Sequence, residues 1–212
     1  MIELLNIDCM TFMATIPDKA FDLAIVDPPY GIGECGGDKK RGRKADNYNK
    51  LVIHIKKEWD NTRPQKQYFD ELFRVSQGQI IWGGNYFIDY LYPSMGWVFW
   101  DKLIGGDFSD GELAWTSFWR ALRQFTYSYH GDTRGGHTRI HPTQKPVALY
   151  DWLLRNYAKP NQRILDTHLG SGSSAIAAHY FGCDFVGCEI DTEYFTAAKE
   201  RFDRETRQVA MF

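Results

Sequence analysis

The first residues that could do chemistry are Asp27-Pro28-Pro29-Tyr30, directly after the apolar run of residues 23–26. Two successive prolines fix φ and remove two backbone N–H donors, so the turn is stiff and presents carbonyl oxygens. Asp27 adds a carboxylate, and Tyr30 adds a flat ring. Acceptors that converge beside a stacking surface suit an amino group on a planar base, so all four are candidate catalytic residues. For these residues alone, a stiff turn with a core tyrosine is an equally good interpretation.

A second turn, residues 166–172, lies between an expected strand and an expected helix. Gly170 and Gly172 allow positive φ and a close approach of a ligand to the backbone, and the following helix would point its N-terminus at that ligand. Glu189 ends the next expected strand, where a carboxylate can accept hydrogen bonds from both hydroxyls of a ribose. Residues 162–207 are therefore interpreted as a β-turn-α-β-α unit of the nucleotide-binding type.

The residues of this turn disfavour NAD and a dehydrogenase. The dinucleotide fingerprint lacks its third glycine, because position 175 is alanine. A carboxylate at Asp166 would repel a pyrophosphate but suits an ammonium group. S-adenosyl-L-methionine carries a ribose and an ammonium group and no phosphate, so we expect it as the cofactor.

Short apolar segments alternate with amphipathic ones along the chain, which predicts an α/β fold with helices on both faces of a mostly parallel sheet. We expect strands at 3–7, 22–26, 79–82, 96–100, 112–117, 163–165 and 184–187. Expected helices cover 65–75, 146–157, 173–181 and 193–207, with Pro146 in a first turn and Thr192 as an N-cap. A length of 212 residues favours one domain.

The composition narrows the class of protein. A formal net charge of -2 means that nucleic-acid binding would need a local basic patch. The four cysteines show no zinc-ligand spacing, so we expect free thiols and no metal. Neither a signal peptide nor a long apolar run is evident, which predicts a cytoplasmic protein.

Together these motifs resemble the DNA amino-methyltransferases in the permuted (β-class) order, in which the catalytic motif precedes the cofactor motif. Residues 27–30 resemble the catalytic motif, and the segment His141-Pro142-Thr143-Gln144-Lys145-Pro146 is similar to the motif before the cofactor strand. Residues 166–172 resemble the cofactor loop, although Thr167-His168 stands where the family usually has Pro-Phe. Residues 5–9 are similar to the N-terminal strand whose acid lies near the cofactor adenine.

The resemblance implies a Rossmann-like, S-adenosylmethionine-dependent methyltransferase fold with a seven-stranded sheet, circularly permuted. It implies one catalytic domain over residues 1–212, with short DNA-contacting inserts at about 31–60 and 103–140. The cofactor-binding residues that it implies are Asp8, Cys9, Asp27, His141, Thr143, Lys145, Asp166, His168, Gly170, Ser171, Gly172, Ser173, Glu189 and Ile190.

The resemblance also implies the reaction. The target base is flipped out of the duplex, Tyr30 stacks on it, and Asp27 with the Pro28 carbonyl accepts hydrogen bonds from its amino group. Adenine N6 is the expected acceptor, because Asp at the first motif position goes mostly with adenine in this family and Ser mostly with cytosine. Cytosine N4, RNA, a protein glutamine and an inactive nucleic-acid-binding relative stay as alternatives.

Double-stranded DNA is the expected partner. The candidate phosphate contacts are Lys39, Lys40, Arg41, Arg43 and Lys44, just after the catalytic turn, and a solvated charged loop is the alternative. A second basic group, near an aromatic segment, contains Arg120, Arg123, Arg134, His137 and Arg139. This group could contact DNA and read base edges, and core plus surface is an equally good interpretation. The small inserts predict a short or relaxed target site. The expected setting is a bacterial or phage-infected cell, with DNA restriction-modification as the context and a homodimer as a hypothesis.

Overall fold

An eight-stranded sheet forms the centre of the computed structural model, which describes residues 1–33, 60–104, 109–128 and 139–207. The strands lie in the order β1-β8-β7-β2-β3-β5-β4-β6, and every neighbouring pair is parallel except β3–β5 and β4–β5. Their bounds are β1 (Ile2–Leu5), β2 (Phe21–Val26), β3 (Ser76–Trp82), β4 (Trp97–Asp101), β5 (Gly111–Thr116), β6 (Arg123–Thr126), β7 (Arg163–Asp166) and β8 (Asp184–Cys188).

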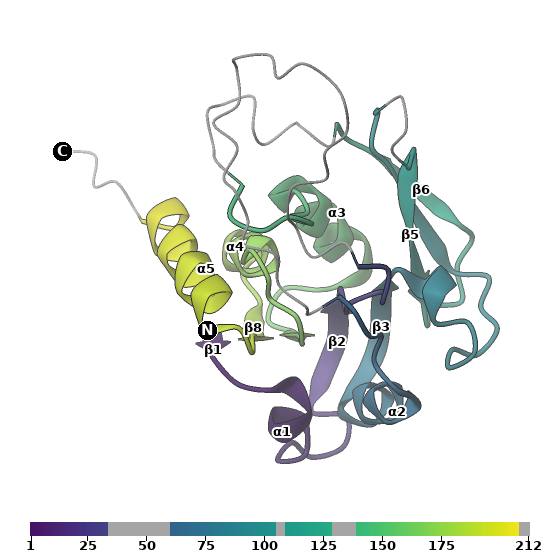
Figure 1. Ribbon diagram of the computed structural model, residues 1–212, viewed down its shortest axis with the longest axis horizontal. Coiled ribbons are helices and arrows are strands. Elements are labelled where there is room, and N and C mark those ends of the chain that lie inside the picture. Colours follow the sequence, from purple (N-terminus) through teal and green to yellow (C-terminus); the bar gives the residue numbers. More distant parts are fainter. Residues whose placement is uncertain (34–59, 105–108, 129–138, 208–212) are drawn as a thin grey trace.

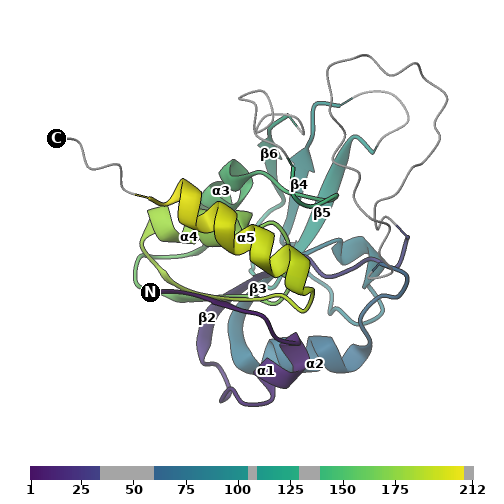
Figure 2. The same cartoon turned by 60° about the vertical axis from the view of Figure 1, so that its left-hand side comes forward.

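Helices cover both faces of this sheet, as Figures 1 and 2 show. On one face lie α1 (Cys9–Met13) and α2 (Lys66–Val75), and on the other α3 (Val147–Tyr157), α4 (Ser173–Phe181) and α5 (Thr192–Glu205). A short 3-10 helix, η1 (Gly84–Tyr86), follows β3. The expected α/β class with a mostly parallel sheet is confirmed, with one strand more than the seven expected.

The central strand β2 explains why two cores form. Its residues Leu23 and Ile25 belong to the core beneath α3 and α4, whereas Ala24 and Val26 belong to the core beneath α1 and α2. Successive side chains of a strand point to opposite faces, so the four consecutive apolar residues 23–26 indicate that both faces of β2 are covered. The continuous apolar run that marks β2 in the sequence is therefore a consequence of its central place.

The structure corrects two helix starts and adds three short elements. Pro146 is the N-cap of α3 rather than a residue of its first turn. Asp191, not Thr192, caps α5, because its carboxylate accepts hydrogen bonds from the Glu193 and Tyr194 N–H groups. The elements α1, η1 and β6 were not predicted, since α1 and η1 span little more than one helical turn and β6 contains a single apolar residue.

The topology places three motifs at one edge of the sheet. β7 lies between β2 and β8, and all three strands run parallel. Their carboxyl ends therefore meet, which brings together Asp27 after β2, the 166–172 turn after β7 and Glu189 after β8. Ligands of open α/β sheets bind at this edge. Among the described residues, no helix is both long and apolar enough to span a membrane.

Candidate active site

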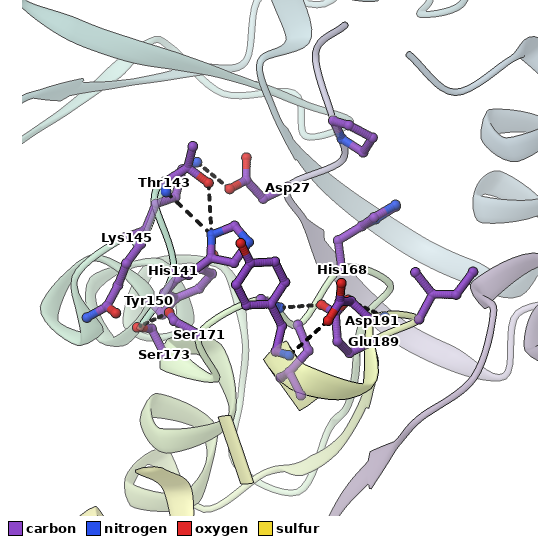
Figure 3. A pocket seen from close by; sticks show the side chains of 16 residues that line it. Asp27, His141, Thr143, Lys145, Tyr150, His168, Ser171, Ser173, Glu189 and Asp191 are labelled. Carbon is purple, nitrogen blue, oxygen red and sulfur yellow. Dashed lines mark hydrogen bonds and ion pairs between the residues drawn. The ribbon is translucent and has the colours of Figure 1, made fainter. Parts of the chain in front are cut away.

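A cavity of about 290 Å³ opens at the carboxyl ends of these strands, close to the lower end of small-ligand sites at roughly 300–1,000 Å³. Eleven of its lining residues were predicted from the sequence: Asp27, Pro29, His141, Thr143, Lys145, His168, Gly170, Ser171, Ser173, Glu189 and Ile190. In Figure 3 the Asp27 carboxyl group lies at one end, apart from Glu189 and Asp191. The cavity thus joins the catalytic turn to the cofactor turn.

Five lining residues were missed by sequence reasoning, namely Gln144, Tyr150, Leu169, Asp191 and Tyr194. Gln144 lies in the 141–146 segment and Leu169 in the 166–172 turn, so the sequence motifs could have predicted that both line the cavity. Tyr150 and Tyr194 come from the first turns of α3 and α5. Their sequence pattern marks them as core-facing helix residues and gives no sign of a ligand.

In the catalytic turn, both oxygens of the Asp27 carboxylate are engaged. Oδ1 accepts a hydrogen bond of 2.7 Å from the Tyr30 hydroxyl, and Oδ2 accepts one of 2.5 Å from the Lys145 ammonium group. Burial raises the pKa of Asp27, and the nearby Lys145 charge opposes that rise. Each carboxylate oxygen has a second lone pair, so Asp27 can still accept a hydrogen bond from a ligand.

The Tyr30 ring does not line the cavity and is already stacked. Tyr86 of η1 lies parallel to it, with 4.9 Å between ring centroids and an interplanar angle of 16°. Gly83 lies so close that a Cβ there would sit 2.2 Å from a carbon of the Tyr30 ring, and its φ of +65° also favours glycine. A base that stacks on the Tyr86 side of Tyr30 must therefore displace Tyr86.

Lys145 is the cation at the catalytic end of the cavity, and its side chain is only 3% exposed. Besides Asp27, it contacts Glu112 of β5 at 3.0 Å and the Tyr30 hydroxyl at 3.3 Å. Burial lowers the pKa of Lys145, but the two carboxylates outweigh burial and the net pKa is raised. Lys145 was expected among the cofactor residues, and here its ammonium group is held by the catalytic turn.

Glu112 was not anticipated as a site residue. Burial raises its pKa, but Lys145 and Lys102 outweigh burial and bring the pKa to about 2. The Lys102 ammonium group lies 2.5 Å from it. Glu112 is far from Asp27 in the sequence and lies in a strand with no motif, so only the pairing of β5 with β3 reveals it.

Asp166 supports the cofactor turn from below and does not line the cavity. It is 1% exposed, and its carboxylate accepts hydrogen bonds from the His168 N–H at 3.0 Å and the Ser174 hydroxyl at 2.6 Å. Burial raises its pKa to about 7. Gly172 likewise lies outside the lining, as the N-cap of α4 with a φ of +74°.

Glu189 connects the cofactor turn to the segment that follows β8. One carboxylate oxygen accepts from the Gly170 N–H at 2.9 Å and the other from the Asp191 N–H at 3.0 Å. Burial raises its pKa. The carboxylate is thus fixed at the cavity wall, where its remaining lone pairs can accept hydrogen bonds from ligand hydroxyls.

The departure from Pro-Phe at positions 167 and 168 creates a hydrogen-bonded chain. The Thr167 hydroxyl lies 2.6 Å from the Tyr68 hydroxyl and 2.9 Å from His168 Nδ1. Burial lowers the pKa of His168 to about 4, so its ring is neutral at neutral pH. A polar, uncharged ring therefore lines the cavity at this position.

The charges that line the cavity fit a cationic ligand rather than a phosphate. Asp27, Glu189 and Asp191 contribute carboxylates, whereas Lys145, the lysine of the lining, is held by Asp27 and Glu112. Among the described lining residues, a phosphate would meet three carboxylates and a lysine that is already paired with two carboxylates. The residues present therefore suit a ligand with ribose hydroxyls and a positive charge.

Several predicted residues lie elsewhere or outside the described ranges. Asp8 is the N-cap of α1, where it accepts from the Thr11 N–H, and neither Asp8 nor Cys9 lines the cavity. Arg139 is partly buried, two residues before His141. The following candidates lie outside the described residues: Lys39, Lys40, Arg41, Arg43, Lys44, Arg134 and His137.

Arg120 and Arg123 lie before and at the start of the edge strand β6. β6 is separated from β2 by β3, β5 and β4, so Arg123 is distant from Asp27 across the sheet. The Arg120 guanidinium donates to the Asn156 carbonyl at the end of α3. Within the proposed insert at about 103–140, the structure places β5 and β6 in the sheet.

Comparisons with known proteins agree with this geometry. The profile of a family described as "DNA methylase" (N6_N4_Mtase) matches residues 81–200, more than half of the chain. The Type II methyltransferase M.HpaI of Haemophilus parainfluenzae is 25% identical over 238 residues, which cover 91% of this chain and 71% of that protein.

Two solved structures share the fold. The M1.HpyAVI–SAM complex superposes with a TM-score of 0.61 at 20% identity and covers 95% of this chain and 100% of that one. The PvuII DNA methyltransferase, described as cytosine-N4-specific, has a TM-score of 0.62 at 12% identity and covers 100% and 88% of the two chains. At these identities the likeness establishes the fold.

Proposed function

Because this chain belongs to the DNA methylase family of N6/N4 amino-methyltransferases, whose cofactor is S-adenosyl-L-methionine, we propose that it methylates the N6 amino group of adenine in duplex DNA. One observation carries the proposal. A single cavity has the Asp27 carboxylate at one end and the Glu189 carboxylate at the other, so a cofactor and an amino group can be held in line.

The chain's own residues divide the binding of the cofactor between them. Glu189 is the acceptor for the ribose hydroxyls, and the glycines of the 166–172 turn allow close contact with the backbone. Asp166, held below the turn, is the proposed countercharge for the ammonium group. Bound there, the cofactor supplies an electrophilic methyl group. Asp8 and Cys9 stay proposed contacts on the side of the adenine.

Asp27 and the Pro28 carbonyl are the proposed acceptors for the substrate amino group. Hydrogen bonds to both oxygens draw the nitrogen lone pair out of conjugation with the base and orient it toward the methyl group. Most of the rate enhancement then comes from positioning and fixed charges. The methylated nitrogen must lose a proton, and Asp27 is the carboxylate hydrogen-bonded to it. The extruded base would take the place of Tyr86 against the Tyr30 ring.

Adenine is proposed rather than cytosine because an aspartate, not a serine, opens the catalytic motif. Cytosine N4 is the second candidate, since the fold is shared with a cytosine-N4-specific enzyme. One experiment decides between them. Unmethylated DNA is incubated with the protein and methyl-labelled S-adenosylmethionine, digested to nucleosides and analysed by mass spectrometry. N6-methyldeoxyadenosine is expected, N4-methyldeoxycytidine would select the second candidate, and the absence of both would refute the proposal.

DNA binding is proposed to use the basic segment at 39–44, which belongs to the first insert. Neutralising Lys39, Lys40 and Arg41 together should weaken binding and lower the dependence of log Kd on log salt by about 0.9 per lost phosphate contact. A slope equal to that of the unchanged protein would contradict the assignment. Sequencing of the methylated positions tests the proposed short target site, and sedimentation tests the proposed homodimer.

A further inference from the structure

The Lys145 ammonium group has three N–H donors and uses all three inside the catalytic cluster. The acceptors are Asp27 Oδ2 at 2.5 Å, Glu112 Oε2 at 3.0 Å and the Tyr30 hydroxyl oxygen at 3.3 Å. Its side chain is 3% exposed, so water does not compete for these donors. Lys145 therefore holds a fixed position that is set by three different segments of the chain.

The charges of this cluster alternate along a line that ends at the catalytic carboxylate. Lys102 lies 2.5 Å from Glu112 Oε1, Glu112 Oε2 contacts Lys145, and Lys145 contacts Asp27. Lys145 is therefore shared by both carboxylates, and Glu112 is shared by both lysines. An Asp27–Lys145 pair without Glu112 would place the whole positive charge on Asp27 and make it a weaker acceptor.

We infer that Glu112 and Lys145 are positioning residues for the proposed reaction: Lys145 fixes and charges Asp27, and Glu112 draws part of the Lys145 charge away. The inference rests on the proposed function, since it concerns the acceptor for the substrate amino group. Lys145 thus opposes the rise in the Asp27 pKa that burial causes, and Asp27 can still accept a hydrogen bond from the substrate amino group. Glu112 reaches the site only through the pairing of β5 with β3.

The groups near Asp27 shift its pKa in different directions. Lys145 lowers its pKa, whereas Glu112 raises it, and the Tyr30 hydrogen bond lowers it. Burial raises the pKa of Asp166, Tyr150 and Tyr68, and the Asp27 charge adds to that rise. Lys102 contacts Glu112 and lowers the Glu112 pKa, so its influence on Asp27 passes through Glu112. Neutral variants of Glu112 and Lys145 should consequently move the Asp27 pKa in opposite directions.

The direct test is carboxyl-carbon NMR of the full-length protein labelled with carbon-13 in the aspartate side chains. The Asp27→Asn variant assigns the Asp27 resonance by its disappearance. In Glu112→Gln the apparent pKa of Asp27 should fall by about one pH unit, and in Lys145→Met it should rise by a similar amount or more. Asp151→Asn changes a partly exposed carboxylate that is paired with Arg155 on α3; it is the matched control and should leave the Asp27 pKa unchanged.

Activity supplies the second measurement. The acid limb of kcat against pH should follow the same opposite shifts, while the dissociation constant of S-adenosylmethionine from calorimetry stays within about twofold. Glu112→Gln should also have a lower plateau, because a less basic acceptor assists less. A merely structural role would reduce activity in both variants without moving the pH profile.

The outcomes separate this inference from the proposed function. If the protein methylates DNA but the Asp27 resonance titrates alike in all variants, or moves in one direction only, the inference is overturned. If the protein methylates neither base, the proposed function fails, while the NMR titration still tests the coupling of the three side chains. Opposite pKa shifts with matching shifts of the acid limb support both.

Discussion

Replacing Asp166 by asparagine should change how the stability of the protein depends on pH. Asp166 is 1% exposed, and its pKa is raised from 3.8 to about 7 because burial penalises the charged form. The folded protein then binds this proton more tightly than the unfolded chain does. Its contribution is fully present below pH 3.8 and is lost as the pH rises through about 7.

The raised pKa fixes the size of the effect. A difference of 3.2 (7 minus 3.8) corresponds to about 4 kcal/mol over the whole range, at about 1.36 kcal/mol per pH unit. Between about pH 5 and about pH 8 the same relation gives roughly 2–3 kcal/mol. His168, with a pKa lowered to about 4, acts in the opposite direction below about pH 6.5, but it is present in both proteins and cancels in the comparison.

The assay is urea unfolding of the cofactor-free protein at both pH values. Asparagine keeps the shape of Asp166, and it can accept from the His168 N–H and donate to the Ser174 hydroxyl. The variant should gain roughly 2–3 kcal/mol relative to the unchanged protein between about pH 5 and about pH 8. Asp70→Asn on the surface of α2 serves as the control. A stability difference that is constant within about 0.5 kcal/mol would refute the reasoning.

The same variant tests the proposed countercharge for the cofactor. If the ammonium group pairs with Asp166, binding near neutral pH should release the Asp166 proton. Calorimetry in buffers with different ionisation heats measures that proton directly. The unchanged protein should release part of one proton, and Asp166→Asn should release none. Equal release by the two proteins would remove Asp166 from the cofactor site and leave it as a support of the turn.

Three further substitutions give distinct outcomes. Tyr30→Phe removes the 2.7 Å hydrogen bond to Asp27 and keeps the ring, so kcat should fall about 10- to 100-fold while KM for DNA changes little; a change confined to KM would contradict this. Glu189→Gln should weaken S-adenosylmethionine binding roughly tenfold or more by calorimetry, and unchanged affinity would exclude a bond to the ribose. Gly83→Ala should lower both Tm and kcat, because its Cβ would lie 2.2 Å from the Tyr30 ring, whereas Gly182→Ala, with a φ of +81° and open space, should lower Tm alone. Equal loss of kcat in the two glycine variants would show that strain, not the Tyr30 contact, is responsible.

Much of the fold could be predicted because its signals are local. The apolar run of β2 marks a strand with both faces covered, and the strand-turn-helix pattern around residues 163–181 marks a cofactor turn. The elements α1, η1 and β6 were missed, since α1 and η1 span little more than one helical turn and β6 contains a single apolar residue, Phe125. The N-cap of α5 was assigned one residue late, because Asp191 and Thr192 are both good caps and only backbone geometry selects one.

The candidate site divides in the same way. Asp27, Glu189 and the glycines of the 166–172 turn were identified because each follows an apolar strand that is recognisable in the sequence. The amphipathic pattern of α3 and α5 could not single out Tyr150 or Tyr194 as cavity residues, since a helix residue next to a core and one next to a ligand look alike. The stacking of Tyr86 on Tyr30 was equally hidden, because the two residues are far apart in the chain.

By itself, the sequence determined the class of fold, the order of the catalytic and cofactor motifs and the residues at the ends of β2, β7 and β8. These are properties of short segments, in which type and spacing are enough. Only the tertiary structure decided that the Lys145 ammonium group contacts the Asp27 carboxylate and that Glu112 contacts the same ammonium group. That assignment depends on distances of 2.5 and 3.0 Å across three segments, and on burial that keeps water from the charges. Both arise only when β5 pairs with β3 and the segment before α3 packs across the carboxyl ends of the strands.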